Sequence, residues 1–177
     1  MVSKGLPSRE QALELLKQKH CSSVVISHCL AVAELALETA SYLEKKGLKV
    51  DTKLVVAGAL LHDLGRSKTH TVDHAIVGAE IAKESGLPEP IIRIIKRHVG
   101  GGITTAEAKA FGWPKDVYVP ETLEEKIVSY SDKLINQSKR MPINDEIERL
   151  QSEGKAEAAE RVRRLYKDIS SLLGNEE

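Results

Sequence analysis

Apolar residues recur every three or four positions along most of this chain, which is the spacing of a helix with one buried face. Ser8 and Gln11 have the spacing of a capping box and predict a first helix over residues 9–19. A long helix then begins at Ser22 or Ser23. It is expected to end where two lysines precede the glycine typical of the position just beyond a helix.

The next two predicted helices surround a polar stretch. A strongly apolar helix is expected over residues 53–64, with Asp51 or Thr52 as its cap and Gly65 as its terminator. After the irregular polar stretch, Asp73 is expected to cap another helix, which closes at a Ser-Gly pair.

The middle of the chain combines a short helix with a long connection. A helix over residues 91–97 leads to His98 and a run of three glycines. Residues 100–120 are predicted to be a long connection with a short helix at residues 106–111. Such connections often act as lids or specificity loops, so we expect this one to lie over the functional site.

A further helix is predicted before the C-terminal part. Thr122 and Glu125 again have the spacing of a capping box. The apolar positions that follow continue the helix through Ile135 and place Asp132 in its middle. A carboxylate beside apolar positions in mid-helix needs a partner, so Asp132 is a candidate functional residue.

The C-terminal part has the composition of a charged, alanine-containing helix, expected over residues 145–173 with a weak point at Gly154. Opposite charges three or four positions apart, such as Glu157 and Arg161, indicate a solvated face. Its apolar side chains would dock either on the domain or on a second subunit, so a homodimer stays open. These side chains are Leu165, Ile169, Leu172 and Leu173.

The pattern as a whole predicts an all-α protein, because it contains no alternation of period two and no internal repeat. A chain of 177 residues is long enough for one ordinary domain. We therefore expect residues 1–177 to form a single domain. Its core would span about residues 22–138, and residues 142–173 would form a charged helical extension.

Composition narrows the range of partners and compartments. The 26 basic and 26 acidic residues balance to a formal net charge of zero, and only 3% of residues are aromatic, so no nucleic-acid partner is expected. Cys21 and Cys29 do not form a Cys-x-x-Cys pair, as is usual in a reduced, cytoplasmic protein. No unbroken apolar stretch approaches the ~20 residues of a spanning helix, so no membrane partner is expected.

The candidate chemistry begins with His62 and Asp63, at the end of the most apolar predicted helix. Burying a carboxylate without a partner costs several kcal/mol, so a buried Asp beside a buried His indicates ion pairing or a metal site. The alternative is that the two residues form a surface feature or a local cap. Other histidines and carboxylates along the chain favour the metal site.

Four residues suffice to bind one divalent metal: His28, His62, Asp63 and Asp132. Their nitrogen and oxygen donors, without a thiolate, suit iron, manganese, cobalt, nickel, zinc or magnesium. His74 and His98 are candidates for a second metal, with Asp63 bridging the two ions. The alternative for these two histidines is hydrogen bonding around the ligands.

The order His28, His62-Asp63, His74, His98 and Asp132 resembles the HD-domain superfamily of metal-dependent phosphohydrolases. The likeness covers about residues 22–137 and includes a distal aspartate followed by lysine. The layout from His74 to His98 is also similar to the subgroup of bacterial diadenosine tetraphosphate hydrolases, which bind two metals, usually iron. Two features depart from relatives. Arg66 stands where several branches have lysine, and the Gly-Tyr-Pro element of cyclic-dinucleotide phosphodiesterases is missing, which disfavours cyclic-di-GMP.

The resemblance implies an HD-domain helical bundle, with a five-helix metal-binding core plus N- and C-terminal helices. It also implies hydrolysis of a phosphomonoester, phosphodiester or phosphoanhydride in a small, nucleotide-like substrate. Asp63 and the metals would lower the pKa of the attacking water. Arg66 and Lys133, and less strongly Lys68 and Arg97, could neutralise phosphate charge, unless they are ordinary solvated cations.

Two alternative functions remain open from the sequence. One is a di-iron oxygenase of the HD type, which would need oxygen and a substrate with a carbon–hydrogen bond to cleave. The other is a nucleotide-binding module that a metal orders and that has no turnover. His20 and His70 lie outside the ligand pattern and are expected to be exposed.

Overall fold

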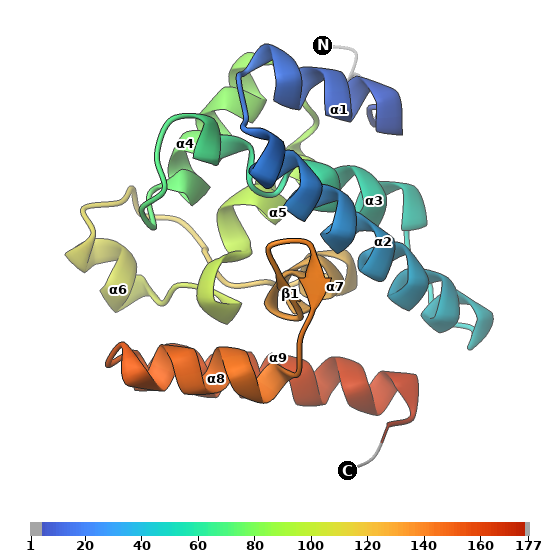
Figure 1. Ribbon diagram of the computed structural model, residues 1–177, viewed down its shortest axis with the longest axis vertical. Coiled ribbons are helices and arrows are strands. Elements are labelled where there is room, and N and C mark those ends of the chain that lie inside the picture. Colours follow the sequence, from blue (N-terminus) through green and yellow to red (C-terminus); the bar gives the residue numbers. More distant parts are fainter. Residues whose placement is uncertain (1–4, 176–177) are drawn as a thin grey trace.

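The all-α prediction is confirmed in this computed structural model, which describes residues 5–175. Within that range nine α-helices and two short 3₁₀ helices account for almost all regular structure (Figure 1). The α-helices are α1 (Arg9–Gln18), α2 (Ser23–Lys45), α3 (Thr52–Leu61), α4 (His74–Glu84), α5 (Glu89–Arg97), α6 (Thr105–Ala110), α7 (Leu123–Lys133), α8 (Ile143–Ser152) and α9 (Ala156–Leu173).

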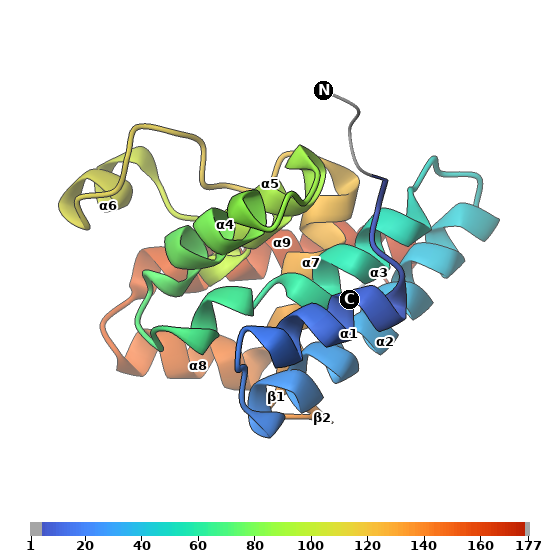
Figure 2. The ribbon, with the colours of Figure 1, turned by 90° about the horizontal axis from the view of Figure 1, so that it is seen from above.

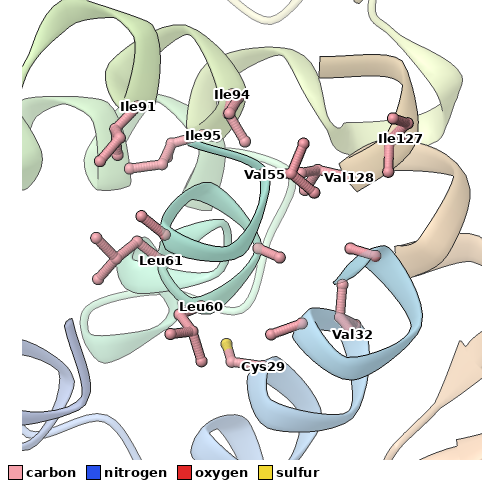
Figure 3. Packing of buried hydrophobic residues seen from close by; sticks show 14 of the residues in the cluster. Cys29, Val32, Val55, Leu60, Leu61, Ile91, Ile94, Ile95, Ile127 and Val128 are labelled. Carbon is pink, nitrogen blue, oxygen red and sulfur yellow. The ribbon is translucent and has the colours of Figure 1, made fainter. Parts of the chain in front are cut away.

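Helix α3 forms the centre of the bundle. It packs against α1, α2, α5 and α7, and every residue from 57 to 61 is buried. Such an all-round apolar helix is stable only inside a core. Figure 3 shows side chains of α3 between those of the neighbouring helices, among them Cys29 and Val32 of α2, Ile91, Ile94 and Ile95 of α5, and Ile127 and Val128 of α7.

The predicted helix starts are largely confirmed by their capping hydrogen bonds. Ser8 and Gln11 form a complete capping box at α1, and Thr122 and Glu125 form one at α7. Ser22 accepts a hydrogen bond from the Val25 amide at the start of α2. These bonds satisfy amide groups that the first turn of a helix leaves without a partner.

Gly65 was expected to terminate α3, and this prediction was wrong. Helix α3 ends at Leu61, and a 3₁₀ helix, η1 (Leu64–Ser67), follows the His62-Asp63 pair. Gly65 is needed because η1 contacts α4 backbone to backbone. A Cβ atom on Gly65 would lie 1.9 Å from the carbonyl oxygen of His74, far inside van der Waals contact.

Asp73 stands at the N-cap position of α4, but its side chain makes no capping bond, so the predicted role was wrong. Its carboxylate accepts a hydrogen bond from Trp113 Nε1 instead, at 2.7 Å. The helix predicted to run through Ile135 stops at residue 133 because a small hairpin of β1 (Ile135–Asn136) and β2 (Lys139–Arg140) follows. Asp132 therefore lies in the last turn of α7 and not in its middle.

The C-terminal segment is divided at Gly154 into α8 and α9, which lie side by side along one edge of the molecule (Figure 1). Leu165 and Ile169 are buried in the main core, so α9 docks on the domain. Arg161 was expected on a solvated face with Glu157. It is mostly buried and instead binds the carbonyl oxygen of Gly102 and the carboxylate of Glu107.

One helix in the described range, α2, is long and apolar enough to cross a membrane by length and composition alone. In this structure 44% of the tested window is buried inside the protein. The contacts of α2 with α3 and α7 bury one face of the helix, whereas Val24, Leu37 and Tyr42 are exposed.

Candidate metal centre

The structure brings all six predicted ligand residues together at the inner end of α3. They come from five separate segments of the chain. His28 belongs to α2, and His62 and Asp63 follow α3. His74 is the first residue of α4, His98 caps the end of α5, and Asp132 lies in α7.

Asp63 lies between two groups of histidines. Its Oδ1 is 3.2 Å from His74 Nε2 and 3.4 Å from His98 Nε2. Its Oδ2 is 3.6 Å from His62 Nε2 and 3.8 Å from His28 Nε2. One carboxylate thus faces two nitrogen pairs with its two oxygens, which is the arrangement required of a group that bridges two cations.

Asp132 completes the group on the side of His28. Its Oδ1 is 2.9 Å from His28 Nε2 and 3.3 Å from His62 Nε2. His28, His62 and Asp132 have donor atoms within 4.8 Å of one another, as do His62, Asp63 and His98. We call the residues His28, His62 and Asp132 the first half of the centre, and His74 and His98 the second half.

The same hydrogen bond orients all four imidazoles. Each Nδ1 lies 2.6–2.7 Å from a backbone carbonyl oxygen, and a carbonyl can only accept, so each Nδ1 carries the proton. The Nε2 of each ring is then the atom that faces the centre. Metal-binding histidines are oriented in this way. The carbonyls belong to Gln137, Ala59, Thr71 and Ile95, in the order of the histidines along the chain.

The second half gives the clearest sign of a cation. Nε2 of His74 and Nε2 of His98 are 3.1 Å apart, although both Nδ1 atoms already donate to carbonyls. Two imidazole lone pairs at this distance repel each other unless a proton or a metal lies against them. Buried Nε2 of His62 and Oδ1 of Asp63 have no hydrogen-bond partner. These atoms fit the donor set of a divalent metal.

The pKa values of the clustered side chains are shifted in different directions. Desolvation opposes charge on His62, but Asp63 and Asp132 raise its pKa well above the usual value. Burial likewise opposes charge on Asp63, yet His62, His74 and His98 lower its pKa well below the usual range. Burial lowers the pKa of His98 to about 4, helped by the charge on His62. The surroundings therefore favour charge on His62 in the first half and oppose charge on His98 in the second.

Two predicted phosphate-binding cations lie at the centre, and two do not. Arg66 Nε donates to Asp63 Oδ2 at 2.9 Å, and Lys133 Nζ donates to Asp132 Oδ2 at 2.8 Å. The prediction for Arg97 was wrong, because its buried guanidinium binds Glu121 and Glu125. The prediction for Lys68 was wrong as well, because its exposed side chain lies outside the cavities beside the centre.

A cavity of about 710 Å³ lies against the centre and is lined by His74, His98 and Asp132. Its volume is within the usual range for sites that bind small molecules. Its walls come from η1, from the segment after α5, and from α8 and α9. An adjoining cavity of about 380 Å³ shares Arg66, Lys133 and Asp132 with it and reaches His28.

A family model for the HD domain matches residues 25–137, which include every candidate ligand. The chain belongs to the HD-domain family. An uncharacterized protein of Methanocaldococcus jannaschii is 46% identical to it over 166 residues, which are 93% of this chain and 98% of the relative. A tRNA (cytidine(56)-2'-O)-methyltransferase of Picrophilus torridus and one of Thermoplasma volcanium are each 38% identical over 98% of this chain. The chain spans about half the length of these methyltransferases.

One relative matches part of the chain in sequence, and one solved structure matches most of it in fold. Ribonuclease Y of Acidothermus cellulolyticus is 38% identical over 76 residues, which are 42% of this chain and 14% of the relative. The HD domain of the L. monocytogenes phosphodiesterase PgpH, in a crystal structure with cyclic-di-AMP, has a TM-score of 0.55 and 24% identity. That match covers 92% of this chain and 95% of PgpH's domain. At this identity the likeness establishes a shared fold.

The sequence did not reveal the residues that form the outer wall of the cavity in this HD domain. Glu107, Phe111, Arg149 and Arg161 line it, two of them from the C-terminal helices. The amphipathic pattern of α9 indicated that it would dock somewhere, but pattern alone cannot select the docking site. His20 and His70 are exposed, as predicted, although His70 borders the cavity.

Proposed function

We propose that this chain, as a single HD domain, is a metal-dependent phosphohydrolase that acts on a small nucleotide-like phosphate. The observation that carries the proposal is the pair of inward-facing nitrogens of His74 and His98, 3.1 Å apart beside an unpartnered oxygen of Asp63. Such a cluster is stable when a cation lies within it. The adjoining cavity provides space for a substrate.

The donor atoms suggest two metal positions. His28, His62, Asp63 and Asp132 would hold one divalent ion, and Asp63, His74 and His98 would hold a second with fewer protein ligands. Nitrogen and carboxylate donors suit iron, manganese, cobalt, nickel or zinc. Divalent metals bound here supply Lewis acidity and lower the pKa of a coordinated water molecule.

The protein's own residues would bind and orient the phosphate. Arg66 and Lys133 place two cations where the cavity reaches Asp63 and Asp132, and a phosphate oxygen in the cavity can accept hydrogen bonds from them. The same cations favour the ionised form of the carboxylates, so that these stay available as ligands. Helices α8 and α9 cover this side of the centre and limit its contact with water.

The decisive experiment combines elemental analysis of the purified protein with a hydrolysis screen. The screen covers AMP, ADP, dinucleoside polyphosphates and cyclic dinucleotides, with manganese or nickel added and oxygen excluded. Two metal equivalents with turnover of dinucleoside polyphosphates would support the two-metal subgroup. One equivalent with turnover of AMP would support a simpler nucleotidase. No phosphate release from any of these compounds would contradict the proposal.

The same screen separates the two alternative functions. Phosphate release without oxygen excludes a requirement for oxygen and so argues against an oxygenase. A nucleotide-binding module would bind nucleotides without turnover, and Asp63→Ala would then change no rate. The matched control is Asp168→Ala, because Asp168 is an exposed aspartate on α9 that lies outside both cavities.

The relatives favour RNA as a second candidate substrate. Two relatives that match almost the whole chain are named as tRNA methyltransferases, and shorter matches are named Ribonuclease Y. The balanced charge of this chain argues in the other direction. A labelled single-stranded RNA and a tRNA transcript, added to the screen, test this candidate. Cleavage of RNA with no turnover of nucleotides would replace the small-molecule proposal.

A further inference from the structure

The cavity beside the metal centre has apolar as well as charged lining. Its charged lining includes Arg66 and Lys133, which lie beside the carboxylates of the centre. Apolar side chains line other parts of it: Val72, Val99, Ile103, Phe111, Leu150 and Ala158. A ligand that fills this cavity would combine a charged group with an apolar one. A nucleotide has this composition, because its phosphate is charged and its base has apolar faces.

Phe111 is the most exposed large apolar residue of this lining. It is the single phenylalanine of the chain, 45% of its surface is exposed, and it lies just beyond the end of α6. Of the described residues that line the cavity, Phe111 alone has an aromatic hydrocarbon ring. An exposed ring of this size gains free energy when a flat apolar group covers it.

Two aromatic residues support Phe111: Trp113 packs against it, and Tyr118 packs against Trp113. The ring of Trp113 lies 5.4 Å from that of Phe111, between centroids, and is tilted by 49°. Trp113 is 9% exposed and also packs edge-on against Tyr118, whose hydroxyl donates to the carbonyl of Pro114. Together with Ala75, Ile103 and Ala108, these two residues form a separate hydrophobic cluster. The exposed ring is therefore attached to a packed support.

The support is connected directly to the metal centre. Trp113 Nε1 donates a 2.7 Å hydrogen bond to Asp73, and Asp73 immediately precedes His74. The segment that carries α6 lies at the margin of the molecule beside α4 (Figure 2). The hydrogen bond thus fixes a marginal segment relative to a candidate metal ligand.

We propose that Phe111 is the platform on which the base of the substrate stacks, which makes residues 99–113 the base-recognition element of the site. This inference rests on the proposed function, because it takes the phosphate of the same molecule to lie at the metal centre. Aromatic side chains bind bases through their faces with little selectivity among bases. The distance from ring to centre, held by Trp113 and Asp73, would select nucleotides by length.

The test compares AMP with ribose 5-phosphate, which has the same phosphate and sugar but no base. In the metal-loaded full chain, Phe111→Ala is expected to lower kcat/KM for AMP roughly 5- to 150-fold, the equivalent of one lost base stack. The rate with ribose 5-phosphate should stay unchanged. Phe111→Tyr should restore most of the loss. Val117→Ala is the control, because Val117 is an exposed apolar residue of the same connection that lies outside the cavity.

A binding measurement keeps this test separate from that of the proposed function. Trp113 is the single tryptophan of the chain and adjoins Phe111, so its fluorescence reports directly on a base bound there. Saturable quenching by AMP that Phe111→Ala weakens would support the platform even if no turnover were found. Equal effects of Phe111→Ala on AMP and ribose 5-phosphate, or no effect on either, would overturn it. Circular dichroism of each variant checks that the fold is intact.

Discussion

The two halves of the candidate metal centre share Asp63 but differ in charge. In the first half, His28 and His62 face Asp132 as well as Asp63, so two carboxylates are available to one cation. In the second half, His74 and His98 face one oxygen of Asp63 and each other. Since carboxylates supply most of the attraction for a divalent cation, the first half should bind metal more tightly.

The extra negative charge of the first half also makes protons compete with the metal there. The negative charge that favours a metal also favours a proton, and it raises the pKa of His62 well above the usual value in spite of burial. The second half has less negative charge, and the pKa of His98 is lowered to about 4 by burial and by nearby His62. We therefore expect tight binding with proton competition in one half, and weaker binding with little competition in the other.

The largest effect is expected from Asp63→Ala, because this change removes the candidate ligand that both halves share. Elemental analysis should show loss of both metals. Hydrolysis should fall by more than the roughly 100-fold that is caused by mutating residues that only hydrogen-bond to metal ligands. Asp168→Ala, at an exposed aspartate of α9, should retain metal and activity. Retention of two metal equivalents in Asp63→Ala would contradict the idea that the two halves share Asp63 as a ligand.

A smaller effect is expected from His98→Ala, which alters the second half alone. Titration with manganese should show that the weaker site is lost and that the tighter site stays within a few-fold of its original affinity. His28→Ala should give the reverse, with loss of the tighter site. If either change abolishes both sites in a variant with an intact circular dichroism spectrum, the halves are not separable.

The pH dependence should also separate the halves. Because the pKa of His62 is raised, its Nε2 is protonated below that pKa in the metal-free protein, and a metal must displace this proton. Affinity at the first half should therefore fall as pH falls below that pKa, by at most about tenfold per pH unit for one displaced proton. His98 stays neutral down to about pH 4, so the second half should vary less above that pH. Calorimetric titrations at pH 6, 7 and 8 test both expectations.

The smallest effect is expected from Lys133→Met, which touches the first half alone. Lys133 Nζ donates to Asp132 at 2.8 Å, and its positive charge opposes a cation at that carboxylate. Its loss should tighten metal binding at the first half by a few-fold, while KM for the phosphorylated substrate rises. Arg140→Met is a suitable control, because Arg140 pairs with Glu38 on the surface and not with the centre. Weaker metal binding in Lys133→Met would contradict this charge argument.

Residues that act through local chemistry were the easiest to predict from the sequence. The capping-box spacings of Ser8 and Thr122 predicted two helix starts, and Ser22 was one of two candidates for a third, because a cap depends on neighbours within one turn. The convergence of the candidate ligands was also predicted, since buried histidines and carboxylates require partners. Their roles as ligands stay predictions until a metal is measured.

What could not be predicted depends on contacts between distant segments. Asp73 is of a residue type that often caps helices, but its carboxylate accepts a hydrogen bond from Trp113, 40 positions away. Arg161 has the spacing of a surface ion pair, yet it binds Gly102 and Glu107 across the fold. The hairpin after α7 was not predicted, because strands of two residues are too short to show a periodic pattern.

The close contact at Gly65 has a consequence for how the site can vary. His74 is held beside Asp63 because η1 and α4 meet main chain to main chain, with no room for a side chain between them. The spacing of the two halves is thus set by the main chain, whereas the outer wall of the cavity, which includes Phe111, Arg149 and Leu150, belongs to other segments. We therefore expect changes in those outer segments to alter which compound is accepted, while the distance between the two halves of the candidate centre is preserved.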